Sequence, residues 1–293
     1  MTRPEDEWGF QAGAPITPEL TAMRLLGGGS AYEAYLAFDE ITYAPVVVKV
    51  VRPGQAGDAT SLRGLRREVE ALATINHPGV VRGLRHHLEG ERPHVVLEEV
   101  DGPRLSSLIR RQGPLPPQQY VALAMDLASV LHYLRHVGWV HLDIKPSNVI
   151  MGAPARLIDL SVARPVEAAR PLTYEIGTDA YMPPEQCVPG GPQVPDFASD
   201  VWGLGATVYH AVTGYRPFDE GDPDAEDRIR RYPQLVDPPY EFPDRTPPQI
   251  VDLLVSTLDA DPAARPAPHQ ISELLAPVME ALPRARLGGL RAR

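Results

Sequence analysis

The sequence contains one cysteine, Cys187, among its 293 residues. A single cysteine excludes a disulfide within the chain and a cysteine-rich metal site. The sequence also lacks a run of apolar residues long enough to cross a bilayer, and its start shows no signal-peptide pattern. We therefore expect a cytoplasmic protein without a transmembrane segment. The net charge of −10 argues against a general affinity for nucleic acid.

Lysine is almost as scarce as cysteine. The chain has 28 basic residues, of which only Lys49 and Lys145 are lysines, and all the others are arginines. The compact ammonium of lysine and the planar guanidinium of arginine are not equivalent where a site has a defined geometry. The two lysines are therefore candidates for functional positions.

What the sequence does contain is a dense group of polar side chains between His141 and Ile150. Asp143 could accept a proton from a hydroxyl, and Lys145 could neutralise a transferring phosphate. Asn148 could hold a metal ion and brace the loop. Apolar residues flank the group on both sides and would anchor it. Such a set suits phosphoryl transfer, in which positioning and charge neutralisation do most of the catalysis.

This stretch resembles the catalytic loop H-R-D-x-K-P-x-N of eukaryotic-like Ser/Thr protein kinases of the bacterial Hanks type, with Leu142 in place of the arginine. The two lysines then fall where this family needs an ammonium. The resemblance implies the bilobal protein-kinase fold of the α+β class, with a small antiparallel-sheet N-lobe and a mainly helical C-lobe. The expected division is a tail over 1–19, a kinase domain over 20–282 and an Arg-rich tail over 283–293. Within the domain, the N-lobe covers about 20–99 and the C-lobe about 102–282.

Three consecutive glycines separate two expected strands, 20–26 and 32–38: Gly27, Gly28 and Gly29. A glycine backbone can approach phosphate closely, although a flexible hairpin would show the same pattern. The stretch resembles the glycine-rich loop of the kinase family, with two departures. Tyr32 stands where the family has a third glycine, and Ala34 stands where it has the valine that covers adenine.

The run 46–50 is typical of a buried strand, yet it contains Lys49. A charged side chain in such a run either lies at an edge or is paired. The resemblance favours a pair with a carboxylate on the helix that apolar spacing predicts over 61–75. Glu68 holds the family position for that carboxylate, and Glu70, on a different helix face, is the alternative.

The resemblance implies that ATP binds between the lobes. It places Leu97, in the expected strand 95–100, at the back of the adenine pocket, with backbone groups of the following residues bonding the adenine edge. The expected nucleotide contacts are Gly27, Gly28, Gly29, Ala34, Val47, Lys49, Leu97, Glu98, Val100 and Ile150.

A short expected strand ends at Asp159, sixteen residues after Asp143. An aspartate at such a place is most often a turn former. The kinase family, however, has Asp-Phe-Gly here, and its aspartate holds Mg²⁺. This chain has Asp-Leu-Ser instead. The resemblance implies that Asn148 and Asp159 bind Mg²⁺ or Mn²⁺.

The stretch from Gly177 to Glu185 resembles the segment that docks a peptide substrate. We expect Glu185 to be buried against Arg265, because an unpaired buried charge would be costly. Asp200 is expected to bond the backbone of the catalytic loop from beneath. The full set of catalytic residues that the resemblance implies is Asp143, Lys145, Asn148, Lys49, Glu68 and Thr178.

Leu142 bears on regulation. In kinases that are switched on by phosphorylation, the arginine at this position pairs with a phosphate on the activation loop. Thr173 is the best remaining phosphosite here, and the nearby Arg164 and Arg170 lie on the loop itself. A phosphate held only there would be mostly solvated, and such pairs contribute little. We therefore expect an activity that does not depend on loop phosphorylation.

Three interpretations stay open. The first is an active kinase that phosphorylates Ser or Thr of a protein substrate. The second is a nucleotide-binding pseudokinase scaffold, suggested by the departures at Tyr32, Leu142 and Ser161. The third is a small-molecule kinase of the aminoglycoside type. The presence of every ionic group favours the first over the second, and the docking segment favours a protein substrate. The oligomeric state is left open.

Overall fold

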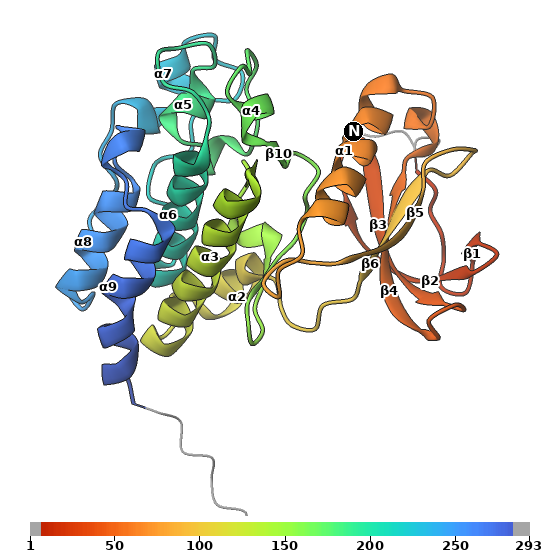
Figure 1. The fold of residues 1–293 in the computed structure, drawn as a ribbon, viewed down its shortest axis with the longest axis horizontal. Coiled ribbons are helices and arrows are strands. Elements are labelled where there is room, and N and C mark those ends of the chain that lie inside the picture. Colours follow the sequence, from red (N-terminus) through yellow and green to blue (C-terminus); the bar gives the residue numbers. More distant parts are fainter. Residues whose placement is uncertain (1–6, 284–293) are drawn as a thin grey trace, which may run out of the picture.

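The computed structural model describes residues 7–283. Figure 1 shows two parts side by side, a sheet with helix α1 (Ala59–Thr74) and a larger group of helices. All neighbouring strands of the sheet are antiparallel. In sheet order, the strands are β1 (Pro15–Thr17), β2 (Leu20–Gly28), β3 (Tyr32–Asp39), β4 (Ala44–Val51), β6 (His94–Glu98) and β5 (Gly83–His87). The expected division into an antiparallel-sheet lobe and a helical lobe is confirmed.

Side chains alternate between the two faces of a strand, and β4 shows how this builds the N-lobe. Val46, Val48 and Val50 face one apolar cluster. Val47 packs in a second cluster with Leu65 of α1. Lys49 therefore lies on the α1 side of the sheet. Helix α1 begins after Asp58, whose side chain accepts a hydrogen bond from the Ser61 amide at 2.7 Å.

The N-terminal segment differs from the expected surface tail over 1–19. Residues 15–17 form β1, and Trp8 and Phe10 pack on the sheet face opposite α1. The Trp8 indole Nε1 donates to the carbonyl of Val51 at 2.7 Å. The N-lobe sheet thus begins before Leu20. Of the tail expected over 283–293, all but Pro283 lies outside the described residues.

The C-lobe is organised around helix α3 (Pro117–Val137). In the sequence, the apolar spacing of this stretch and the glycine after it predict a helix with the same bounds. Gly138 ends it in the left-handed conformation at φ 76°, as glycine often does. Helix α3 packs against α6 and α9. The other helices of this lobe are α2 (Leu105–Gln112), α4 (Val166–Ala169), α5 (Pro184–Cys187), α6 (Phe197–Thr213), α7 (Arg228–Arg231), α8 (Pro248–Thr257) and α9 (Pro268–Ala281).

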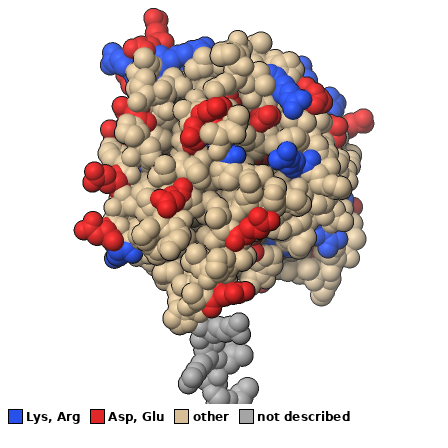
Figure 2. Space-filling view, turned by 60° about the vertical axis from the view of Figure 1, so that its left-hand side comes forward, with Lys and Arg blue, Asp and Glu red and all other residues tan. Residues whose placement is uncertain are grey.

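Two short strand pairs hold the loop that follows α3. The first joins β7 (Trp139–Val140) to β10 (Arg164–Pro165), and the second joins β8 (Val149–Ile150) to β9 (Arg156–Leu157). These pairs bring residues 141–148 and Asp159 together on the side of the C-lobe that faces the sheet. On the face shown in Figure 2, charged side chains lie scattered between larger uncharged areas. Within residues 7–283, no helix is both apolar and long enough to cross a membrane.

Candidate active site

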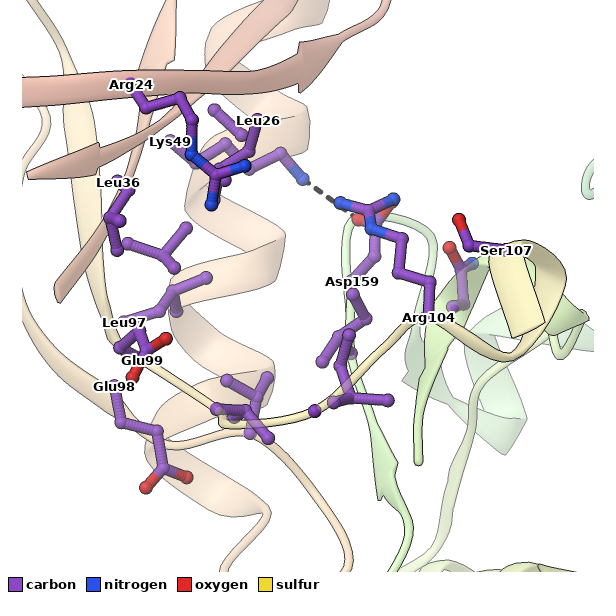
Figure 3. Close-up of a pocket in the computed structure, with 18 of the residues that line it drawn as sticks. Arg24, Leu26, Leu36, Lys49, Leu97, Glu98, Glu99, Arg104, Ser107 and Asp159 are labelled. Carbon is purple, nitrogen blue, oxygen red and sulfur yellow. Dashed lines mark hydrogen bonds and ion pairs between the residues drawn. The ribbon is translucent and has the colours of Figure 1, made fainter. Parts of the chain in front are cut away.

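A cleft of about 410 Å³ lies between the two lobes, lined by residues from both. Most of the expected nucleotide and metal residues line it, namely Ala34, Val47, Lys49, Leu97, Glu98, Val100, Asn148, Ile150 and Asp159, as does Glu68 of the expected catalytic set. Figure 3 shows Lys49 and Asp159 joined across the cleft. The sheet supplies apolar lining residues such as Val47 and Leu97. Lys49 and Asp159 lie together at one end of the cleft, far from Glu98 at the other (Figure 3).

Lys49 is held by two carboxylates. Its Nζ lies 2.7 Å from Oε2 of Glu68 and 2.9 Å from Oδ1 of Asp159. The expected partner Glu68 is thus confirmed over Glu70. Burial disfavours the charged ammonium, but the attraction of the two carboxylates outweighs it and holds the pKa of Lys49 above its ordinary value. Lys49 remains a cation at the point where nucleotide phosphates would lie.

The carboxylate of Asp143 is the centre of a second network. Lys145 Nζ donates to its Oδ2 at 2.7 Å, and the Thr178 hydroxyl donates to its Oδ1 at 2.7 Å. Lys145 also donates to that hydroxyl at 2.5 Å. The Asn148 amide donates to the Asp143 carbonyl at 2.9 Å. Four of the expected catalytic residues therefore form one connected group.

The donor set fits a divalent cation such as Mg²⁺. Mg²⁺ is usually held by one or two carboxylates together with water and substrate phosphates. Asp159 offers a carboxylate whose pKa is held below its usual range by Lys49, in spite of burial. The Nδ2 of Asn148 donates to Asp143, so its Oδ1 is the atom that would bind a metal ion. Within residues 7–283, no cluster of three or more His, Cys, Asp or Glu side chains could hold a metal by itself.

The backbone of the catalytic loop is held from below, as expected. Asp200 accepts hydrogen bonds from the amides of His141 and Leu142 at 2.7 and 2.8 Å. Leu142 and Asp159 both have a left-handed backbone, with φ of 63° and 65°. This conformation is uncommon for residues other than glycine and tends to persist at functional sites.

Leu142 joins the expected catalytic loop to the segment from Asp159 to Glu185, the expected activation segment, through apolar contacts. Its side chain is buried in a cluster with Val140, Val166, Ala169 and Leu172. The last three residues belong to helix α4 and the chain just after it. The segment that an arginine–phosphate pair would order in the family that the sequence resembles is therefore packed here on a leucine.

Arg164 is buried, although a phosphate held by the arginines of this loop was expected to be mostly solvated. Arg164 is only 3% exposed, and its guanidinium donates to the Tyr174 hydroxyl at 3.2 Å. Burial lowers its pKa from the ordinary arginine value. Arg170 does lie at the surface, where it pairs with Glu167 at 2.9 Å. The short strand β10 buries Arg164, and no sequence pattern indicates a strand of two residues.

Glu185 and Arg265 form the buried pair that was expected. Both side chains have no exposed surface, and the two guanidinium nitrogens reach the two carboxylate oxygens at 2.7 and 2.9 Å. The Ser199 hydroxyl also donates to Glu185 at 2.7 Å. The pair fixes α5, and with it the end of the candidate docking segment, to the C-lobe.

The structure also departs from the expected nucleotide set. Along the part of the cleft that the structure describes, Gly27, Gly28 and Gly29 do not appear as lining residues. Gly27 and Gly28 end β2 and pair with β3, and Gly29 begins the turn between the two strands (the glycine turn). The Gly29 amide closes this turn by donating to the Tyr32 carbonyl at 3.0 Å.

Several lining residues were missed by the sequence analysis. They include Arg24, Leu26, Leu36, Val81, Arg104 and Ser107. Figure 3 shows Arg24 and Arg104 on opposite sides of the cleft. Leu36 could have been found, because it lies two residues after Ala34 on the same strand, and alternate residues share a face.

Comparison with known proteins agrees with this geometry. A family model for the protein kinase domain matches residues 20–275. Serine/threonine-protein kinase PknB of Mycobacterium leprae is 34% identical over 203 residues, which are 66% of this chain and 32% of PknB. Serine/threonine-protein kinase PknL of Mycobacterium tuberculosis is 31% identical over 250 residues, 84% of this chain and 61% of PknL. The chain thus spans about a third of PknB and less than two thirds of PknL. It belongs to the protein kinase domain family.

Proposed function

We propose that this domain transfers the γ-phosphate of ATP to Ser or Thr hydroxyls of protein substrates in the cytoplasm. The observation that carries the proposal is the network around Asp143. There the hydroxyl of Thr178 donates to the carboxylate of Asp143 and accepts from the ammonium of Lys145. A substrate hydroxyl in the same setting would face both a proton acceptor and a cation. The printed names of PknB and PknL, both serine/threonine-protein kinases, support this choice of substrate class.

The residues have distinct roles in the proposed reaction. Asp143 orients the substrate hydroxyl and takes its proton. The substrate oxygen forms a bond to the γ-phosphorus while the bond from that phosphorus to ADP breaks. Lys49 and Lys145 neutralise charge on the phosphates. Asn148 and Asp159 would hold a divalent metal ion, which supplies further charge neutralisation when bound.

The departures from the family motifs do not favour the pseudokinase alternative. Leu142 leaves both backbone hydrogen bonds to Asp200 in place. Ser161 follows an Asp159 that still contacts Lys49. The buried pair that fixes the candidate docking segment favours a protein over a small-molecule substrate.

The direct test is transfer of label from γ-labelled ATP to a generic Ser/Thr-rich protein, with identification of the labelled amino acid. In this assay, Lys49→Met should lower the rate by roughly 10²–10³-fold, the usual effect of one well-placed charge at a developing anion. Arg66→Met, which removes an exposed cation from α1, is the matched control and should leave the rate unchanged. Turnover of Lys49→Met within tenfold of wild type would remove Lys49 from the catalytic set.

We further propose that activity does not require a phosphate at Thr173. This residue is exposed, and the segment around it is already packed on Leu142. A pair between this phosphate and the surface Arg170 would be exposed, and such a pair contributes about 0–1 kcal/mol. Shifting a segment from mostly disordered to mostly ordered takes about 5.5 kcal/mol.

Thr173→Ala and phosphatase-treated wild type should therefore both keep most of the activity in steady-state assays, after mass spectrometry has verified the loss of phosphate. A drop of more than about thirtyfold, or 2 kcal/mol, in both samples would contradict this proposal. It would indicate that the buried Arg164 serves as a phosphate partner.

A further inference from the structure

Tyr32 lies where related kinases carry the third glycine of their glycine-rich loop. Its side chain does not point to solvent but is half-buried against α1. The hydroxyl donates to the carbonyl of Ser61 in the first turn of that helix. Its own carbonyl closes the glycine turn by accepting from Gly29. One residue thus touches both the glycine turn and the helix that carries Glu68.

Gly64 makes room for this contact. A Cβ atom at Gly64 would lie 2.6 Å from the Tyr32 hydroxyl oxygen, closer than such atoms approach in real proteins. Glycine within a helix costs about 1 kcal/mol relative to alanine. The presence of a glycine within α1 is therefore explained by the tyrosine that packs on it.

The ring of Tyr32 also lies beside Lys49, with Nζ 5.0 Å from the ring centroid. A cation at this distance from an aromatic face is attracted to it. Lys49 is held at the same time by Glu68, seven residues beyond Ser61 on α1. The helix is therefore tied to the sheet at two points, by Tyr32 near its start and by the ion pair near its middle.

We propose that Tyr32 is a positioning residue that holds α1 against the sheet so that Glu68 keeps Lys49 directed into the cleft. It acts through Lys49 and does not contact the reacting atoms. Only the expected effect of Tyr32 on the reaction rate rests on the kinase function proposed above. The expected effect of Tyr32 on the Lys49–Glu68 pair does not depend on any activity.

Because lysine is scarce, the accessibility of Lys49 in its pair with Glu68 can be measured directly. Lys49 and Lys145 are the only side-chain amines in the chain. The rate of modification of Lys49 by an amine-reactive reagent, read by mass spectrometry, can thus be referred to Lys145 in the same molecule. Tyr32→Phe keeps the ring but loses the hydroxyl bond, and Tyr32→Gly loses both. We expect relative labelling of Lys49 to rise about threefold or more in Tyr32→Phe, and further in Tyr32→Gly, since one hydrogen bond corresponds to about 3–10-fold in an equilibrium.

The coupling of Tyr32 to Gly64 is tested by a double-mutant cycle. Gly64→Ala should displace the tyrosine in the wild-type background, raise Lys49 labelling and lower kcat/KM by about tenfold. In the Tyr32→Gly background, the same alanine meets no hydroxyl and should change either quantity less than twofold. Gly57→Ala is the matched glycine control, because a Cβ there meets open space. Tyr43→Phe is the matched tyrosine control, since Tyr43 is 77% exposed.

Four outcomes are informative. Unchanged Lys49 labelling in Tyr32→Phe and Tyr32→Gly would overturn the proposal, as would equal effects of Gly64→Ala in both backgrounds. A lower unfolding temperature with unchanged labelling would show a merely structural tyrosine and would also overturn it. If labelling responds as expected but wild type transfers no phosphate, the positioning role stands and the kinase function fails.

Discussion

Asp143→Asn should lower the rate of phosphoryl transfer by about 10²–10⁴-fold, the usual contribution of a positioned acid–base group. An amide is nearly the same size as a carboxylate but cannot take the proton of the attacking hydroxyl. The asparagine amide would also place its NH₂ group opposite Lys145 or Thr178. Both of these residues donate hydrogen bonds to Asp143 and could not accept one in the same arrangement. Asp143 is not among the residues that line the nucleotide cleft. The affinity for ATP should therefore stay within a few-fold of wild type.

The measurement is single-turnover transfer from labelled ATP, with nucleotide affinity determined separately by titration. Asp252→Asn, which alters an exposed aspartate on α8, is the matched control and should behave as wild type. A rate for Asp143→Asn within tenfold of wild type would contradict its role as proton acceptor. Parallel losses of rate and affinity would instead indicate a collapsed loop.

Arg265→Met should destabilise the domain by about 3–5 kcal/mol, because it leaves the Glu185 carboxylate buried without its cation. Both side chains of the pair have no exposed surface. The arginine also donates to the carbonyls of Ala198 and Asp259 at 2.9 Å. Its loss would thus remove partners from both buried oxygens of Glu185 and from two partly buried carbonyls. The measurement is the shift of the midpoint of urea unfolding, multiplied by the slope of the transition.

Two further variants separate the charge from the packing at this site. Glu185→Leu combined with Arg265→Met removes both charges, and replacing a whole buried pair by apolar groups is often neutral or stabilising. The double variant should therefore recover much of the lost stability. Glu167→Gln breaks the exposed pair with Arg170 and should change stability by about 1 kcal/mol or less. A single variant at Arg265 that resembles Glu167→Gln would show that the pair is not important for stability.

The residues of the ionic network were predictable because motif and periodicity agreed. Helical spacing and the family position together selected Glu68, and the structure pairs it with Lys49 at 2.7 Å. The Glu185–Arg265 pair followed from the cost of burying either charge alone. Helix α3 was predicted to the residue, because its apolar spacing ends at a glycine suited to a helix C-terminus.

Other features depend on single long-range contacts that leave no periodic pattern. Trp8 reaches the carbonyl of Val51 across more than forty residues, so nothing local indicates that residues 7–17 cover the sheet. The sequence also does not indicate that the Tyr32 side chain points toward α1. Gly64 is a local sign of this contact, but its reason is clear only in the structure, where the Tyr32 hydroxyl lies against it.

The apolar cluster around Leu142 has a further consequence for the conditions under which the activation segment stays ordered. A segment held by a phosphate and an arginine loosens as ionic strength rises, because mobile ions screen exposed charges within about 10 Å at 0.1 M salt. Contacts among leucine, valine and alanine are not screened in this way, and stabilising salts such as sulfate strengthen them. They weaken on cooling instead, as apolar burial does in general. The order of this segment should therefore respond to cooling and to stabilising salts, but not to the screening of charges by ionic strength.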